Sequence, residues 1–497
     1  MRTTPIGLVL MNDERPHVHA ANEADNMTVL RRWGEALAGR VRNADGSAPE
    51  LVLGRETIKS VRSAQEVGEQ LRRAGCRSLV LCFNVWNFPY LVWPLLNSVG
   101  RDVPVLSLSN DNGAFPGNVG LLATDGALRQ AGLRTHRIVG EVEDEATLEA
   151  AGDWLRAAQA VTTIRNEVYG LYGGHSMGME TGFFHLVPTI QALGTNPYQI
   201  DQLWVVERMK QVDADEARTG REWLESLLGD RLRYDGEMLT PGKLETQLRL
   251  YLAIRELNDE NGFDYCGIKG QRELSEHVCI ADVAEMLLND PYDWRGRKEP
   301  TVCATEADAY GAITMQLLKY VSGGLPSLFM DVRLYHPDLD VWDFVNSGQH
   351  ATWYATRSDD PAANFAEVTF HPALPFYFKA GGASVEFDAA PGPATFARFG
   401  LWDDRPYLLI VAGEVVDLPA DRRRALNEQT NPTWPHVHAR LRCDYEEFVD
   451  VFPCNHILAT PGDAVRPLVR LAEIAGVPSV VLGPRGRRPP IWERLAE

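Results

Sequence analysis

The sequence has little cysteine and no long apolar run, and each absence excludes a class of protein. Its 497 residues include seven cysteines at scattered spacings, without a Cys-x-x-Cys pair. This argues against a disulfide framework and favours reduced thiols in a cytoplasmic protein. A transmembrane helix needs about 18 consecutive apolar residues, and no stretch of the sequence approaches that length. The short apolar start at Ile6–Met11 is followed by polar residues and lacks a signal-peptide cleavage pattern.

Basic charge is also scarce, with 49 Lys and Arg against 68 Asp and Glu and a net charge of -19. A field of that sign repels polyphosphates and anionic lipids, so we expect neither nucleic acid nor a membrane surface as partner. An anionic small molecule is not excluded, because salt screens distant charges and a local basic pocket can outweigh them. The length predicts about two or three domains.

Residues 1–162 alternate short apolar runs with amphipathic patterns, which predicts a first α/β domain with buried parallel strands. The strands and helices expected there are Ile6–Met11, Asn26–Arg40, Ser78–Phe83, Val103–Leu108 and Glu145–Thr162.

A second α/β domain is predicted over 163–342, and a β-rich domain over 343–497. The second domain begins with a strand-to-loop transition at Gly170–Met179, and the third ends in a basic, Pro-rich tail. The elements expected in these two domains are helices at Val212–Leu228, Lys243–Asn261 and Asp463–Gly476, and strands at Thr395–Leu401 and Arg405–Leu418 joined by the turn Trp402–Arg405.

The segment from Pro300 to Asp331 carries the strongest chemical signal. It is predicted to form a strand ending at Glu306, a helix over 307–322 and a second strand ending at Asp331. A right-handed crossover puts two such strands parallel and usually adjacent, roughly 4.8 Å apart. Both carboxylates would then face one point above the sheet, where they would share a proton or a divalent cation. The alternative is that both acids cap helices or lie in solvent-facing loops.

An imidazole would make a metal site more credible. His456, in the polar stretch Phe452–His456, is the strongest candidate among the twelve histidines, and a hydrogen-bonded structural histidine is the alternative. Oxygen ligands with one nitrogen suit Mn²⁺ or Mg²⁺ better than a metal that prefers thiolates.

Several short motifs, in a fixed order between about Arg165 and Ala459, resemble those of the L-fucose isomerase family. They are Gly173-Gly-His-Ser-Met-Gly178, Gly270-Gln-Arg272, Ala304-Thr-Glu-Ala-Asp-Ala-Tyr-Gly-Ala312, Phe329-Met-Asp-Val-Arg333, Asn346-Ser-Gly348, Thr430-Asn-Pro-Thr-Trp-Pro435 and Asn455-His456.

The resemblance implies that Glu306, Asp331 and His456 bind Mn²⁺, with Mg²⁺ or Co²⁺ as substitutes. It implies an α/β fold with two Rossmann-like domains followed by a β-rich, small barrel-like domain. It also implies a homo-hexamer in which the first domain of a neighbouring subunit helps to close each site.

The implied activity is that of a metal-dependent aldose–ketose isomerase working through a cis-enediolate. A chelated cation stabilises the enediolate, while one carboxylate moves a proton between C2 and C1 and the other handles the hydroxyl proton. We expect Glu306 and Asp331 to be this pair, with their individual roles open, and His456 to be a ligand only.

Further positions match the family near the sugar: Ser347, Asn455, Trp434, Met177 and Gln271. Trp434 could stack on the apolar face of a sugar or simply pack in the core. Arg333 could orient Asp331 from behind or form a structural ion pair.

The first domain matches the family least, which leaves the substrate open. The Arg- and Gly-rich substrate segment expected after the first strand is missing, and Arg15 is its candidate replacement. The positions that could form a basic rim for a C6 sulfonate are His175, Lys269, His436, His438 and Arg440. Each of them is also explained as an ordinary surface or loop residue.

Two substrates therefore remain: a neutral sugar, L-fucose or D-arabinose, and sulfoquinovose, a sulfonated 6-deoxyglucose that would become sulfofructose. The missing N-terminal segment and the cationic positions favour the second. The alternatives from other functional classes are a catalytically silent sugar-binding or regulatory relative, and a metal-dependent sugar epimerase or aldolase.

Overall fold

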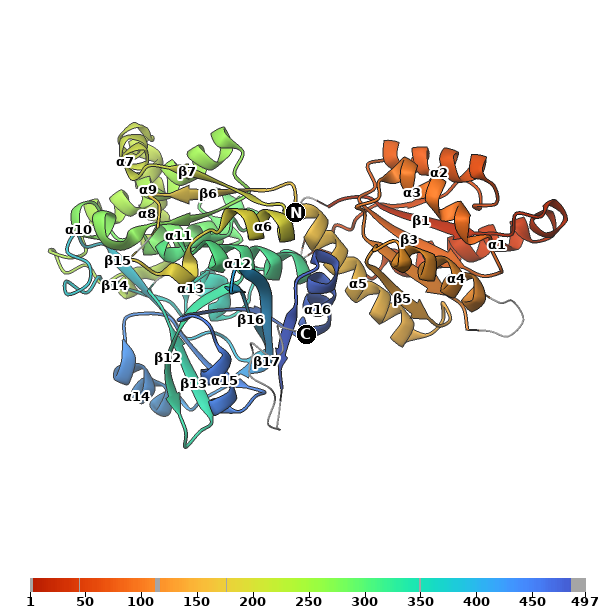
Figure 1. The fold of residues 1–497 in the computed structure, drawn as a ribbon. Helices are drawn as coiled ribbons and strands as arrows, with labels where there is room; N and C mark the ends of the chain where they lie inside the picture. The colour runs from red at the N-terminus through yellow and green to blue at the C-terminus, as the bar shows by residue number, and fades with distance from the viewer. Residues whose placement is uncertain (1–2, 44, 112–116, 176, 348–349, 484–497) are drawn as a thin grey trace. The chain divides into compact units, whose positions relative to one another are not determined.

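The computed structural model describes residues 3–43, 45–111, 117–175, 177–347 and 350–483. They belong to two units, Met1–Arg165 with Arg466–Gly476, and Asn166–Val465 with Val477–Glu497 (Figure 1). Two motif positions, Ser176 and Gly348, and the basic tail from 484 onward lie outside the described residues. In the described part of the chain, no helix is both long and apolar enough to cross a membrane.

The first unit, red to orange in Figure 1, contains a five-stranded parallel sheet in the order β2-β1-β3-β4-β5. Its strands are β1 (Ile6–Met11), β2 (Leu51–Leu53), β3 (Ser78–Phe83), β4 (Val105–Ser109) and β5 (Thr135–Val139). Every residue of β1, β3 and β4 is buried, as expected for parallel strands covered on both faces. The strands predicted at Ile6–Met11 and Ser78–Phe83 are confirmed as β1 and β3. The strand predicted from Val103 is β4, which begins at Val105.

Helices cover both faces of this sheet. α1 (Pro16–Ala38) and α5 (Glu145–Ile164) pack on one face, and α2 (Val61–Arg73), α3 (Val92–Val99) and α4 (Gly117–Gln130) pack on the other. α1 begins at Pro16 rather than at the predicted Asn26. Proline fits the first turn of a helix, but residues 16–25 are mostly exposed or half-buried and give no apolar periodicity to read.

The second unit begins with a four-stranded parallel sheet in the order β11-β8-β6-β7. Its strands are β6 (Val168–Tyr172), β7 (Asn196–Ile200), β8 (Tyr265–Ile268) and β11 (Cys303–Ala304). The predicted helices are present as α8 (Ala214–Leu228), capped by Asp213, and α9 (Pro241–Asn261), capped by Thr240. The other helices and short strands around this sheet are α6 (Leu186–Leu193), α7 (Gln202–Gln211), α10 (Ser275–His277), α11 (Asp282–Asn289), α12 (Ala309–Val321), α13 (Pro361–Phe365), β9 (Tyr292–Asp293), β10 (Gly296–Arg297), β14 (Thr369–Pro372) and β15 (Ala383–Glu386).

A seven-stranded sheet forms the rest of this unit, in the order β16-β19-β12-β13-β18-β17-β20. Because β16 also pairs with β17, the first six of these strands close into a ring. The strands are β12 (Leu328–His336), β13 (Val341–Val345), β16 (Gly392–Trp402), β17 (Arg405–Val415), β18 (His436–Leu441), β19 (His456–Pro461) and β20 (Ser479–Leu482), and the later helices of this unit are α14 (Ala420–Thr430) and α15 (Tyr445–Val451). The last helix, α16 (Val465–Ala475), belongs to the first unit from Arg466 onward.

The hairpin between β16 and β17 confirms the predicted turn. Trp402 pairs with Arg405, and Asp403 and Asp404 between them have φ values of 50° and 59°. Two consecutive residues at positive φ give a tight turn whose twist matches that of the flanking strands.

The predicted crossover between Glu306 and Asp331 is wrong in one respect. β11 pairs with β8 in the parallel sheet, whereas β12 pairs with β13 and β19 in the seven-stranded sheet. The intervening α12 is buried over its whole length and contacts strands of both sheets. A helix that is buried all round lies between two layers, so it carries the chain from one sheet to the other.

The architecture is therefore mixed α/β, with parallel sheets and a large C-terminal β-sheet, in agreement with the predicted class. The predicted boundary at 342/343 lies within β13, and the division into three domains stays a prediction.

Candidate metal centre

The three predicted ligands meet at one point although their strands belong to different sheets. Asp331 lies directly opposite His456 in the β12–β19 ladder, and Glu306 follows β11. The Nε2 atom of His456 is 3.2 Å from Oε2 of Glu306 and 3.3 Å from Oδ1 of Asp331. The carboxylate pair therefore converges on the imidazole nitrogen.

Glu306 is presented by a strained turn. Its backbone has φ 56° and ψ 18°, and Ala307 follows at φ 53°. Side chains other than glycine adopt this left-handed conformation rarely, at a cost of about 1–3 kcal/mol, and such residues gather at functional sites. The turn is held between β11 and Asp308, whose side chain accepts a hydrogen bond from Gly311 N (2.8 Å) and so caps α12.

The donor atoms fit a divalent metal ion. His456 is 1% exposed, and its Nε2 atom is buried without a hydrogen bond, being aligned with neither carboxylate. Its Nδ1 atom is 2.7 Å from Oδ2 of Asp308. With the proton on Nδ1 donated to Asp308, the Nε2 lone pair faces Glu306 and Asp331. Two carboxylate oxygens and one imidazole nitrogen form a ligand set that suits Mn²⁺.

Asp308 and Arg398 form a buried ion pair behind His456 that the sequence did not reveal. Arg398, on β16, donates to both carboxylate oxygens of Asp308 at 2.6 and 3.0 Å, and both side chains are at most 1% exposed. Burial alone would raise the pKa of Asp308, but Arg398 and His456 outweigh it and hold that pKa below its ordinary value. Asp308 stands in the Ala304–Ala312 motif, which was its only signal; nothing local links it to Arg398.

The same network acts on His456. Burial lowers the pKa of His456, but the bond to Asp308 and the nearby Asp331 and Glu306 carboxylates raise it well above its ordinary value. A bound cation at Nε2 would replace the proton that these acids attract.

Two further predicted residues, Asn455 and Arg333, adjoin Asp331, and a third, Trp434, lies beside Arg333. Asn455 Nδ2 donates to Oδ1 of Asp331 at 3.3 Å. Arg333 Nη1 is 3.7 Å from Oδ2 of Asp331, and its guanidinium lies 5.6 Å from the centre of the Trp434 ring. Trp434 is only 6% exposed and packs with Phe378, which agrees with its core-packing alternative.

The remaining predicted sugar contacts of this unit make local contacts. Met177 is 55% exposed at φ 47°, and His175 stacks on Phe183 with 4.1 Å between ring centres. Gln271 accepts a hydrogen bond from Ser275 (3.0 Å). The amide of Ser347 donates to the Asn346 side chain (2.6 Å).

Most of the cations proposed for a basic rim have carboxylate partners. Lys269 lies 2.9 Å from Glu273, and Arg440 lies 3.0 Å from Glu414. Two more, His436 and His438, are buried around Asp343, and the fifth, His175, stacks on Phe183. The rim is therefore largely neutralised.

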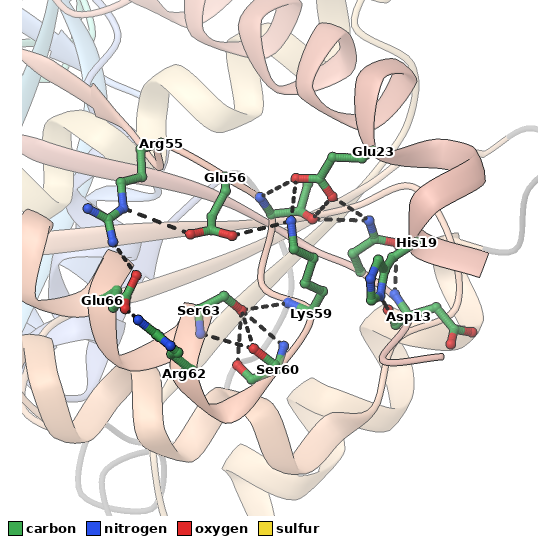
Figure 2. Close-up of polar contacts among 12 residues, drawn as sticks. Asp13, His19, Glu23, Arg55, Glu56, Lys59, Ser60, Arg62, Ser63 and Glu66 are labelled. Carbon is green, nitrogen blue, oxygen red and sulfur yellow. Dashed lines mark hydrogen bonds and ion pairs between the residues drawn. The ribbon is translucent and has the colours of Figure 1, made fainter. Parts of the chain in front are cut away.

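Arg15 belongs to the first unit and is treated separately. It makes a two-pronged ion pair with Asp13, with 2.6 Å between Nη2 and Oδ2. Figure 2 shows the polar network beside this turn, where Lys59 lies 3.1 Å from Glu23 and 3.2 Å from Glu56. Arg15 and Lys59 are thus already paired with carboxylates near the end of β1.

Comparisons with known proteins agree with the geometry. Three domains described for L-fucose isomerase match the chain: the first N-terminal domain over residues 3–166, the second N-terminal domain over 255–323 and the C-terminal domain over 344–482. The L-fucose isomerase of Vibrio vulnificus is 25% identical over 94% of this chain and 91% of its own length. Those of Bacteroides thetaiotaomicron and Haemophilus influenzae are also 25% identical, over 93% and 94% of this chain and 90% of their own length.

Proposed function

Because this chain belongs to the L-fucose isomerase family and is an aldose–ketose isomerase, we propose that it converts a 6-deoxyhexose-type aldose to its ketose. The reaction would use a divalent ion held by Glu306, Asp331 and His456. The observation that supports this most directly is the convergence of both carboxylates on the buried, unsatisfied Nε2 atom of His456. Mn²⁺ is the proposed ion, with Mg²⁺ or Co²⁺ as substitutes.

The ion would polarise the sugar carbonyl and stabilise the negative charge that develops on the sugar oxygens. Glu306 and Asp331 then act as the acid and base pair: one moves the proton between C2 and C1, and the other handles the hydroxyl proton. Both carboxylates are partly exposed, at 18% and 21%, so a substrate can reach them. His456 is held by Asp308 and serves as a ligand.

A neutral sugar of the L-fucose or D-arabinose type is the favoured substrate. The relatives are L-fucose isomerases, and most cations that would attract a sulfonate are neutralised by carboxylates. One observation keeps sulfoquinovose as the second candidate: Arg333 is 35% exposed beside Asp331 and is 3.7 Å from that carboxylate, too far for a tight pair. The proposal is completed by a cytoplasmic homo-hexamer, which rests on the family resemblance and the composition.

The test is a sugar panel with metal-stripped enzyme before and after addition of Mn²⁺. L-fucose, D-arabinose and sulfoquinovose are compared by kcat/KM, and the products are followed by NMR in D₂O. Deuterium entering at C1 of the ketose and C2 of the aldose, with all carbon–carbon bonds intact, is the expected result. Cleavage or a C-epimer as product would instead support the aldolase or epimerase alternative. Higher kcat/KM for sulfoquinovose than for the neutral sugars would reverse the preference between the two substrates.

A further inference from the structure

A second group of metal-ligating side chains lies in the same seven-stranded sheet, on β13 and β18. Asp343 lies directly opposite His438 in the antiparallel ladder, and His436 is two residues before His438. Residues two apart in a strand point to the same face, so both imidazoles face the carboxylate. Their ligating atoms all lie within 4.8 Å of one another.

The near atoms of the three side chains are oriented toward one another. Nδ1 of His436 is 2.9 Å and Nε2 of His438 is 3.6 Å from the same oxygen, Oδ1 of Asp343. The two imidazole rings are nearly parallel, with an interplanar angle of 11°. Ligand atoms at such separations are compatible with one shared ion about 2.0–2.2 Å from each of them.

Hydrogen bonds hold His436 and Asp343 from behind, and a carboxylate lies near the far nitrogen of His438. The far nitrogen of His436 lies 2.8 Å from the carbonyl of Asn431, and that of His438 lies 3.8 Å from Asp388. Thr430 donates its hydroxyl proton to Oδ2 of Asp343 at 2.9 Å. Outer partners of this kind orient metal ligands and fix which imidazole nitrogen carries the proton.

The hydrogen bonding is incomplete without a cation. His436 faces an oxygen acceptor at both nitrogens, but a neutral imidazole has only one proton to donate. An imidazolium would satisfy His436, yet the Nε2 atom of His438 would still be buried without a hydrogen bond, in a side chain only 3% exposed. A divalent ion at the centre satisfies both imidazoles and the Asp343 carboxylate, which is itself fully buried.

We propose that Asp343, His436 and His438 bind a structural divalent transition-metal ion of the zinc type, separate from the ion at Glu306, Asp331 and His456. Imidazole and carboxylate ligands in a closed, buried site suit Zn²⁺. This assigns His438 a ligand role in place of the substrate contact predicted from the sequence. The ion would join β13 and β18.

The experiment counts metal in the full-length protein after chelator treatment and reloading with Zn²⁺, by inductively coupled plasma mass spectrometry. Wild type is expected to retain about two ions per chain, and Asp343→Asn and His438→Gln about one, because each removes a ligand of the second group. The control is His456→Gln, which removes a ligand of the first centre and should also leave one ion.

The outcomes separate this inference from the proposed function. A single ion in wild type that survives in Asp343→Asn and disappears in His456→Gln would overturn the inference. A single ion with the opposite behaviour would uphold it while removing metal from the proposed active site. Because loss of a buried ligand can unfold the chain, a zinc-edge anomalous difference map of wild-type crystals soaked in Zn²⁺ is the second measurement. A peak among the three side chains supports the site, and an empty map overturns it.

Discussion

The same pair, a histidine facing an aspartate across two antiparallel strands, occurs twice in the seven-stranded sheet. His456 opposes Asp331 between β19 and β12, and His438 opposes Asp343 between β18 and β13. In the first pair the carboxylate is 21% exposed, whereas in the second the carboxylate is fully buried and the imidazole 3% exposed. This difference in access, rather than in ligand type, is why we propose a sugar-binding centre at the first pair and a structural ion at the second.

The backbone differs in the same sense. The first centre takes a third ligand, Glu306, from a left-handed turn, and its histidine is supported by a buried ion pair. The second takes all its side chains from regular strands, and His436 is supported by a backbone carbonyl. Strained backbone costs stability, and of the two clusters only the first takes a ligand from a strained turn.

The largest effect should come from Glu306→Gln. The amide keeps the size of the side chain but cannot take up a proton, so kcat for the preferred sugar should fall by about 10³-fold. Steady-state kinetics with Mn²⁺ measures it, and circular dichroism checks that the fold is kept. Glu276→Gln is the control, since Glu276 pairs with Arg272 (3.2 Å) and lies outside the ligand set. A Glu306→Gln enzyme with wild-type kcat would remove Glu306 from the mechanism.

Asp308→Asn should have the second-largest effect, and that effect should be confined to the first centre. It weakens the acceptor that orients His456 and leaves Arg398 buried without its counter-charge, so the affinity for Mn²⁺ should fall by about 10–100-fold. Isothermal titration of the stripped protein measures this. Asp388→Asn is the matched control, because Asp388 lies behind His438 instead and should leave Mn²⁺ affinity unchanged. Equal loss in both variants would mean that the two centres are not independent.

Some parts of the structure could be predicted from short stretches of sequence, and others could not. The buried strands β1 and β3, the hairpin turn at Asp403 and the ends of α8 and α9 at Leu228 and Asn261 follow from short local patterns, and these were predicted closely. The sheet assignment of β12 was not, because it depends on pairing with β19, which lies far along the chain. The residue types of the candidate centre could be identified from strand ends and motifs, but Arg398 and the cluster at Asp343 required distant contacts that no periodicity encodes.

Asp343→Asn tests the structural role proposed for the buried cluster. Losing a charged ligand of the buried cluster should lower the unfolding free energy of the Zn²⁺-loaded protein by about 2 kcal/mol. Its kcat at saturating Mn²⁺ should stay within about twofold of wild type, because the open centre keeps its three ligands. Thermal unfolding with and without added Zn²⁺ measures the first effect. Zn²⁺ should raise the Tm of wild type by more than that of the variant, which keeps only the first centre. A large loss of kcat with unchanged stability would reverse the roles assigned to the two centres.

The smallest effects should come from the cations predicted to form a basic rim. Lys269→Met and Arg440→Met each remove a charge that is already paired with Glu273 or Glu414, and partly exposed ion pairs contribute little. For a neutral sugar, KM should therefore change by less than about fivefold in either variant. Arg333→Met is the informative counterpart, because Arg333 is the cation beside Asp331. In Arg333→Met, the KM for sulfoquinovose could rise far more than the KM for L-fucose. That result would identify Arg333 as the sulfonate contact and the open centre as a site for an anionic sugar. Parallel changes of KM for both sugars would leave Arg333 as a group that orients Asp331.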